Sequence, residues 1–427
     1  MLSKMSIGSK IVLSVCLVLA FCMGLLIVAL ISTSQHIQED DARKLVENSA
    51  KRTSNAIEGY INEGFVSLNY SQYILSNYIH DKSLNENMAK NILTTLLDSN
   101  QWVEYGYIYL KNSALLPDST SGHKLSNGGV MIVGHDVSSK DTGDVKILNA
   151  NEVFLNDSGV QHALKSGKPS VGGPVKITID GEEILSLSLN YPIKDADGSI
   201  QGVIGTTLDF DMIAESLFAQ RRSTFKNDYR SLVTENGVFL LHPRSEFVGK
   251  SFMEIAALRD NPTIKPVVEA LAKHESGVHE IENAAGENSI MGLASFEMGR
   301  NLTGQYLGVL VVAPTSSVYA SMSIMKKIMV AGVLGCLITV SLFVFVYIRM
   351  TIARRIQHIS HTLFEFFNYL NHKTNTPPQP LKIIAQDELG QMGSAINQNI
   401  EQTNKNLDQD TKAIEQSAQT AKEIESG

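Results

Sequence analysis

The residues best suited to bind a small molecule lie in a short, tyrosine-rich stretch. Tyr105, Tyr107 and Tyr109 alternate within residues 103–110, a run rich in Tyr, Ile and Val that predicts a β-strand. Because alternate side chains of a strand point to one side of its sheet, the three rings should share a face. They either line a pocket or form an aromatic core, since aromatic residues favour strands for packing alone. Trp102, the single tryptophan, either caps that pocket or anchors the strand.

Catalytic and metal-binding motifs are absent from the sequence. It has no Gly-x-Ser-x-Gly elbow, no Gly-x-x-x-x-Gly-Lys-Ser/Thr phosphate loop and no His-Glu-x-x-His zinc signature. His358 and His361 share a helical face, but at outward heptad positions typical of a solvated surface. His279 lies beside Glu280 and Glu282 on what we expect to be a solvated turn. We therefore expect no enzyme activity, no cofactor and no metal site.

Composition narrows the class of protein. A length of 427 residues predicts two or three domains. The net charge of -8 leaves no basic stripe to neutralise phosphates, which argues against nucleic-acid binding. All three cysteines, Cys16, Cys22 and Cys336, lie in apolar runs, so no disulfide framework is expected between those runs.

The two apolar runs, residues 11–31 and 328–348, are long enough to cross a bilayer. A cleaved signal peptide is the alternative for the first run, but its core exceeds a usual signal core and favours a retained anchor. The flanking basic residues are Lys4 and Lys10 before the first run, and Lys326, Lys327, Arg349, Arg354 and Arg355 around the second. Their balance places residues 1–10 and the C-terminus in the cytoplasm. Residues 32–327 then lie outside a bacterial inner membrane, in the periplasm.

The segment between the two apolar runs predicts an α+β domain. Residues 35–78 and 84–97 have helical periodicity, and residues 117–156 are typical of a loop over a pocket. Strands are predicted at 103–110, 130–133, 175–179, 184–189 and 200–208, and again at 229–233, 238–241, 289–296 and 306–312. Asp180-Gly181 indicates a hairpin, and residues 209–226 a helical crossover between the two sets of strands. The repeated order indicates a duplicated antiparallel sheet.

Two motifs in this segment resemble a known sensor family. They are Gly202-Val203-Ile204-Gly205 ahead of Leu208-Asp209, and residues 235–243 with Val248-Gly249-Lys250. These two motifs, in this order and between two membrane spans, resemble the double Cache domain of bacterial chemoreceptors. The resemblance covers residues 35–320. It implies a long N-terminal helix beside two stacked PAS-like antiparallel sheets, a distal module at about 80–210 and a proximal one at about 227–315.

The resemblance also implies where a ligand binds. The distal module usually carries the pocket, and amino-acid-sensing members hold the ligand with an arginine and with an Asp after the Gly-Val-x-Gly strand. Here no arginine lies between Arg52 and Arg221, and Thr207 stands where that Asp is expected, with Asp209 two residues on. We therefore expect a small carboxylate or a neutral polar metabolite instead of a free amino acid. Further candidate contacts are His135, Lys176, Thr207 and Asp209.

The segment after the second apolar run, residues 349–403, resembles a HAMP linker. Ile356, Ile359, Leu363, Phe366 and Leu370 form a seam typical of helices that pair with their own copies, which predicts a homodimer. A connector at 371–385 contains prolines that cannot continue a helix. Asp387-Glu388-Leu389-Gly390, with Met392, Ile396 and Asn397, matches the second HAMP helix. The resemblance implies that Arg355, Asp387, Glu388 and Gly390 transmit signals, although Arg355 replaces the usual proline. A generic coiled coil is the alternative.

Taken together, the sequence is identified as a member of the methyl-accepting chemotaxis receptors, bound to the inner membrane. Residues 404–427 are expected to begin a coiled coil, and a cytoplasmic kinase and adaptor would bind a region beyond Gly427. Two alternatives remain open. One is the sensor half of a histidine kinase or diguanylate cyclase, and the other is a periplasmic protein-docking module.

Overall fold

The structure is a computed structural model that describes residues 7–138, 140–179, 181–371, 373–374 and 376–426. Lys4 and Asp180, on which two of the predictions above rely, lie outside these residues. The chain forms two compact units. One is Gln35–Ser323, and the other combines Met1–Ser34 with Ile324–Gly427.

The unit Gln35–Ser323 contains two antiparallel sheets of matching topology. The first has the order β3-β2-β1-β6-β5-β4 and the second β8-β7-β11-β10-β9, so five neighbouring strands repeat in the same order. The first comprises β1 (Val103–Leu110), β2 (Val130–Asp136), β3 (Val145–Leu148), β4 (Ser170–Ile179), β5 (Glu182–Lys194) and β6 (Ile200–Leu208). The second comprises β7 (Tyr229–Thr234), β8 (Phe239–Leu241), β9 (Gly277–Glu282), β10 (Asn288–Glu297) and β11 (Tyr306–Pro314). The predicted α+β fold with a duplicated sheet is confirmed.

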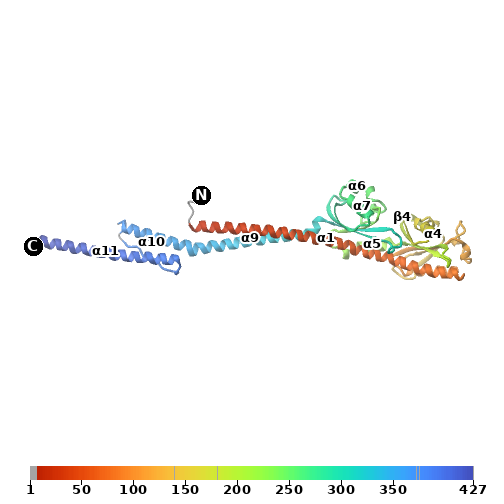
Figure 1. Cartoon of the computed structure of the whole chain (residues 1–427), viewed down its shortest axis with the longest axis horizontal. Helices are drawn as coiled ribbons and strands as arrows, with labels where there is room; N and C mark the ends of the chain where they lie inside the picture. Colours follow the sequence, from red (N-terminus) through yellow and green to blue (C-terminus); the bar gives the residue numbers. More distant parts are fainter. Residues whose placement is uncertain (1–6, 139, 180, 372, 375, 427) are drawn as a thin grey trace. The chain divides into compact units, whose positions relative to one another are not determined.

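A single helix covers one face of both sheets. Helix α1 (Ile7–His80) has 74 residues, and its part after Gln35 runs past both sheets (Figure 1). Ile57, Ile61, Leu68 and Leu75 return to the same side of the helix at steps of four and seven and are fully buried. They belong to one apolar cluster with Ile108 and Ile204 of the first sheet and Leu232 and Val309 of the second. Helix α2 (Glu86–Asp98) packs against β1 and β2.

The opposite face of each sheet carries short helices. The first sheet is covered by α3 (Glu152–Leu155) and α4 (Ser158–Ser166), and the second by α6 (Ala256–Arg259) and α7 (Lys265–Ala272). Helix α5 (Phe210–Phe218) connects the sheets, and α8 (Thr315–Val318) follows β11. Short 3-10 turns lie at Ser113–Leu115, Ser121–His123, Gln220–Arg222, Ser245–Phe247 and Phe252–Glu254.

Two local predictions are wrong. Residues 117–156 were expected to be a loop apart from the strand at 130–133, which β2 confirms, but they also contain β3 and α3. His279, expected on a turn, lies in β9 opposite Met291 of β10. In both places the strands are short or polar, and pairing with a neighbouring strand fixes them where local propensity does not.

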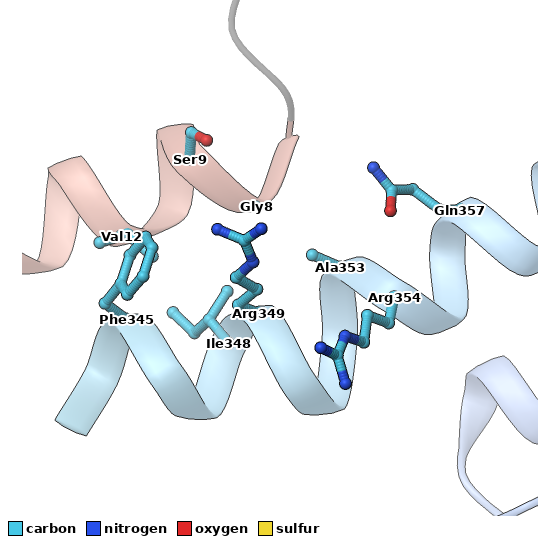
Figure 2. A pocket seen from close by; sticks show the side chains of 9 residues that line it. All are labelled: Gly8, Ser9, Val12, Phe345, Ile348, Arg349, Ala353, Arg354 and Gln357. Carbon is cyan, nitrogen blue, oxygen red and sulfur yellow. The ribbon is translucent and has the colours of Figure 1, made fainter. Parts of the chain in front are cut away.

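The other unit is helical. It contains α9 (Ala320–Ile348), a π-helical segment Arg349–Ala353, α10 (Arg354–Leu370) and α11 (Glu388–Ser426). The apolar start of α1 and the stretch that includes α9 are long and apolar enough to cross a membrane. A cavity of about 290 Å³ lies between Gly8, Ser9 and Val12 on one side and Phe345 to Gln357 on the other (Figure 2). A Cβ added at Gly8 would lie 2.9 Å from the Ala353 Cβ, so the two helices approach closely there.

Candidate ligand-binding site

The tyrosines of β1 form a closed aromatic layer on the face of the first sheet that points away from α1. Tyr105, Tyr107 and Tyr109 lie in one apolar cluster, and their exposed fractions are 3%, 0% and 6%. Tyr105 stacks on His135 of β2, with ring centroids 4.2 Å apart. Phe154 of α3 covers Tyr107, with centroids 4.9 Å apart. The structure thus brings four of the predicted site residues together.

A buried chain of hydrogen bonds lies beside this layer. The Tyr107 hydroxyl donates to Asn190 Oδ1 at 2.5 Å, Asn190 Nδ2 donates to Ser188 Oγ at 2.8 Å, and Ser188 Oγ donates to Asp157 Oδ1 at 2.7 Å. Asp157 also caps α4 by accepting from the backbone N–H groups of Gly159 and Val160. Burial, and next the negative charge of Asp157, raise the pKa of Tyr107 well above its usual value. The phenol therefore stays protonated and acts as a donor.

Three glycines permit these polar groups to approach the backbone. A Cβ added at Gly205 would lie 2.5 Å from the Tyr107 hydroxyl, and one at Gly159 would lie 2.5 Å from Asn190 Nδ2. A Cβ at Gly172 would collide with both carboxylate oxygens of Asp157. The network is therefore enclosed by backbone on several sides. Because these groups pair with one another, a ligand at this face would have to replace one of their hydrogen bonds.

Asp157, Ser188 and Asn190 were not among the residues predicted from the sequence. A usable signal was present in β5, where Ser186, Ser188 and Asn190 alternate with leucines, and all three polar side chains are buried. Polar alternation within a strand is ordinarily read as a solvent face. The first sheet is covered on both faces, so here the same alternation marks a buried polar face.

The remaining predicted ligand contacts lie away from the Tyr107 network or serve the backbone. Trp102 stacks on Tyr60 of α1 at 3.5 Å between centroids, and its indole N–H donates to Glu63 at 3.2 Å. Thr207 Oγ1 accepts from the Tyr105 backbone N–H at 3.2 Å, and Asp209 caps α5 by accepting from the Met212 backbone N–H at 2.9 Å. Lys176 pairs with Glu183 at 2.7 Å on an exposed hairpin.

The predicted signalling residues meet at one joint between α10 and α11. The Arg355 guanidinium donates to both carboxylate oxygens of Asp387, at 2.5 and 2.6 Å. Asp387 also accepts from the Gly390 backbone N–H at 2.9 Å, and the Arg355 hydrogen bonds followed by this one lower the pKa of Asp387 to about 2. Glu388 occupies the first turn of α11. A side chain at Gly390 would collide with the Ala385 carbonyl, which explains the glycine.

A second contact fixes the connector to α11. The Asn397 side chain accepts from the Leu381 backbone N–H and donates to the Leu381 carbonyl, both at 2.8 Å. A cavity of about 380 Å³ remains between α10, the connector and the start of α11. Ile359 and Phe366 of the predicted seam are buried in this joint.

Comparisons with known proteins agree with this architecture. A Cache domain family model, dCache_1, matches residues 34–322. The periplasmic sensory domain of the Campylobacter jejuni chemoreceptor Tlp1 is 22% identical, with a TM-score of 0.58, and the match covers 66% of this chain and 98% of that one. Methyl-accepting chemotaxis protein X is 17% identical, with a TM-score of 0.53 over 64% of this chain and 98% of that one.

The extracellular domain of mmHK1S-Z3, a protein classed as a histidine kinase, is 15% identical, with a TM-score of 0.52 over 67% of this chain and 98% of that one. With identities below 25%, these structural similarities show a shared fold alone. No curated protein sequence matches the chain. Because the family match spans more than half of the 427 residues, the chain belongs to the Cache domain family.

Proposed function

We propose that the chain is the sensor and membrane portion of a methyl-accepting chemotaxis receptor, whose Cache domain binds a small molecule outside a bacterial inner membrane. The observation that carries this proposal is the order of parts along the chain. The Cache match at residues 34–322 is flanked by the two apolar helical segments. Large apolar side chains such as Phe21, Leu25, Leu342 and Phe343 are mostly exposed in these segments, as lipid-facing residues are.

The proposed topology is testable with two exposed positions. Thr178 of β4 would lie outside the membrane and Gln398 of α11 inside. Thr178→Cys and Gln398→Cys, in a chain whose three native cysteines are replaced by alanine, would be treated with a membrane-impermeant maleimide after the outer membrane is opened. We expect labelling of the first variant alone, until the inner membrane is also permeabilised. Equal labelling of both in intact inner membranes would refute the proposal.

The ligand is proposed to bind on the Tyr107 face of the first sheet. The buried hydroxyl and amide groups of Tyr107 and Asn190 support a small polar metabolite, and the nearby Asp157 carboxylate favours a neutral one over a small carboxylate. All of the buried apolar clusters described for the unit Gln35–Ser323 are formed by its own residues, so this unit is suited to isolated study.

A thermal-shift screen of residues 35–323 against metabolites tests the ligand proposal. A molecule that binds only the folded state must raise the melting temperature. For any hit, the rise in melting temperature should shrink in Asn190→Ala. It should persist in Asn127→Ala, a matched change at an exposed asparagine beside Tyr109. A protein partner, which is the docking alternative, would instead stabilise the domain where every metabolite fails.

Signal transmission is proposed to run through a HAMP-like joint in a homodimer. Ligand binding would move the second span against the first by about 1–2 Å, the scale of helix shifts in switching proteins. A Cβ added at Gly8 would lie 2.9 Å from the Ala353 Cβ, so these two positions are close enough to crosslink. A Gly8→Cys/Ala353→Cys disulfide, in a chain without its native cysteines, should abolish the response while leaving ligand affinity nearly unchanged. A crosslinked receptor that still responds would exclude this movement.

The output is proposed to be a chemotaxis kinase with its adaptor, bound through a region beyond Gly427. The likeness of fold to Tlp1 supports this, and the likeness to mmHK1S-Z3 favours a histidine kinase as the second candidate. Chimaeras of residues 1–427 with each class of output domain would separate them. The proposal requires ligand-dependent control of the chemotaxis kinase in at least one heptad register, and control of the histidine kinase alone would favour the second candidate.

A further inference from the structure

The second sheet has an open cavity on the face that α6 and α7 cover. An outer cavity of about 210 Å³ is lined by residues that include Tyr229, His242, Arg244 and Glu287. An inner cavity of about 20 Å³ lies between β7, β8, β11 and the short helices, and shares Tyr229, His242 and Asn283 with the outer one. The inner space is of a size for one water molecule or one methyl group.

Ser231 is an unpartnered polar group in the inner cavity. It follows Tyr229 by two residues on β7, so both side chains point to the same side of the sheet. Its exposed fraction is 1%, and among the residues that the structure describes its hydroxyl has no hydrogen-bond partner. Buried hydroxyl groups are nearly always hydrogen-bonded, so this one indicates a missing partner.

His242 supplies a second donor. Its Nδ1 accepts from the Arg244 backbone N–H at 2.9 Å, so the neutral ring carries its proton on Nε2. Burial, the largest cause, lowers the pKa of His242 to about 4, and the ring is therefore neutral near pH 7. Phe239 and Phe247 hold the imidazole, with ring centroids 5.1 and 4.8 Å away.

Arg244 and Glu287 carry opposite charges at the outer cavity, so the preference for an acceptor comes from the hydrogen-bond donors around it. The Arg244 guanidinium lies over the Phe247 ring at 5.6 Å and is exposed at the mouth. Glu287 is the carboxylate among the lining residues, and the Asn283 amide donates to it at 3.4 Å. Arginine, imidazole and two hydroxyl groups therefore face a mostly apolar interior. A carboxylate on a short apolar stem matches this set, because arginine binds carboxylates strongly and the stem suits the aromatic floor.

We propose that the second sheet carries its own ligand site, which binds a short-chain monocarboxylate. The carboxylate group lies at Arg244 and His242, the apolar stem lies on the Phe239 and Phe247 rings, and one water molecule in the inner cavity joins the Ser231 hydroxyl to the carboxylate. This site is separate from the Tyr107 face of the first sheet, and it stands or falls independently of the ligand proposed there.

The test uses the full chain in lipid nanodiscs with propanoate as the probe. Propanamide and propylammonium keep the stem and change the charge, so they serve as matched ligands. We expect propanoate to raise the melting temperature most. Arg244→Ala should weaken propanoate binding by about tenfold or more, because a hydrogen bond to a charged group is lost. The matched control is Arg259→Ala, an exposed arginine of the same module that pairs with Asp260.

Two further variants keep the test independent of folding. Tyr229→Phe keeps the ring, and Ser231→Ala removes a hydroxyl that the unliganded protein leaves unpaired, so neither should lower the melting temperature without ligand by much. Both should weaken propanoate. Equal binding by Arg244→Ala and Arg259→Ala, or equal stabilisation by all three probes, would overturn the site. Propanoate binding that is lost in Tyr107→Phe but kept in Tyr229→Phe would overturn it too, while leaving the first sheet's site intact.

Discussion

The two sheets of the Cache domain share one strand order and differ in what fills their outer faces. In the first, Tyr105, Tyr107 and Tyr109 of β1 close the face, and Phe154 covers them. In the second, β7 occupies the same place in the sheet but presents Tyr229 and Ser231, beside a cavity of about 210 Å³. The face that packs on α1 is apolar in both. The shared fold therefore sets the packing of each sheet on α1, and a few side chains on one strand determine whether the outer face is closed or open.

The largest effect on stability should come from breaking the polar network of the first sheet. Gly172→Ala places a methyl group against Asp157, which must then leave Ser188 and the cap of α4. We expect a loss of about 3 kcal/mol in unfolding free energy, from overpacking and broken buried hydrogen bonds. In β9 of the second sheet, Gly277→Ala meets open space and should change stability by less than about 0.5 kcal/mol. Denaturant unfolding of both variants measures the contrast, and equal losses would contradict it.

A smaller loss is expected from one hydroxyl of the aromatic layer. Tyr107→Phe leaves Asn190 Oδ1 without its buried donor and should cost about 1–3 kcal/mol. Tyr109→Phe is the matched change. Its hydroxyl accepts from Asn127 at 3.2 Å, and the exposed Asn127 amide can turn to water, so a loss below about 1 kcal/mol is expected. Thermal unfolding checks the ranking, and the reverse order would mean that the network is not what closes this face.

The open face should respond to pH. The folded-state pKa of His242 is lowered to about 4, mainly by burial, from an ordinary value near 6.5. Between these values the unfolded chain binds more protons than the folded one, so this contribution to stability is complete above pH 6.5 and is lost as pH falls toward 4. As pH falls across that window, the melting temperature of His242→Phe should decline less steeply than that of the wild type. Parallel curves would show that His242 is not titrating in a buried site.

The smallest effect concerns the exposed hairpin of the first sheet. Lys176 pairs with Glu183 at 2.7 Å, but both side chains are more than half exposed. Such pairs contribute little, so Lys176→Ala should change stability by less than about 1 kcal/mol and leave ligand-induced stabilisation unchanged. A lost ligand response in this variant would return Lys176 to the binding site.

Local patterns predicted the elements well, while the site depends on contacts between distant residues. The strands at 103–110 and 200–208 were predicted to the residue, because dense β-branched and aromatic runs between turn residues specify them locally. The Tyr107 network joins residues 83 and 31 positions apart, which periodicity does not relate. Alternation likewise placed the β1 tyrosines on one face without indicating what covers it. At the joint, local contacts explain two residues of the HAMP-like motif. Asp387 accepts from the Gly390 backbone N–H, and Gly390 permits a close approach of the backbone.

Hydrogen exchange of the full chain in nanodiscs, with and without a stabilising metabolite, tests the central claim most directly. We predict slower exchange on the outer face of one sheet, at residues 103–110 with 152–166 or at 229–242. We also predict a simultaneous change in residues 354–370 and 388–397, where Arg355 pairs with Asp387. Protection of a sheet face with no change at that joint would contradict a receptor that passes binding to its helices.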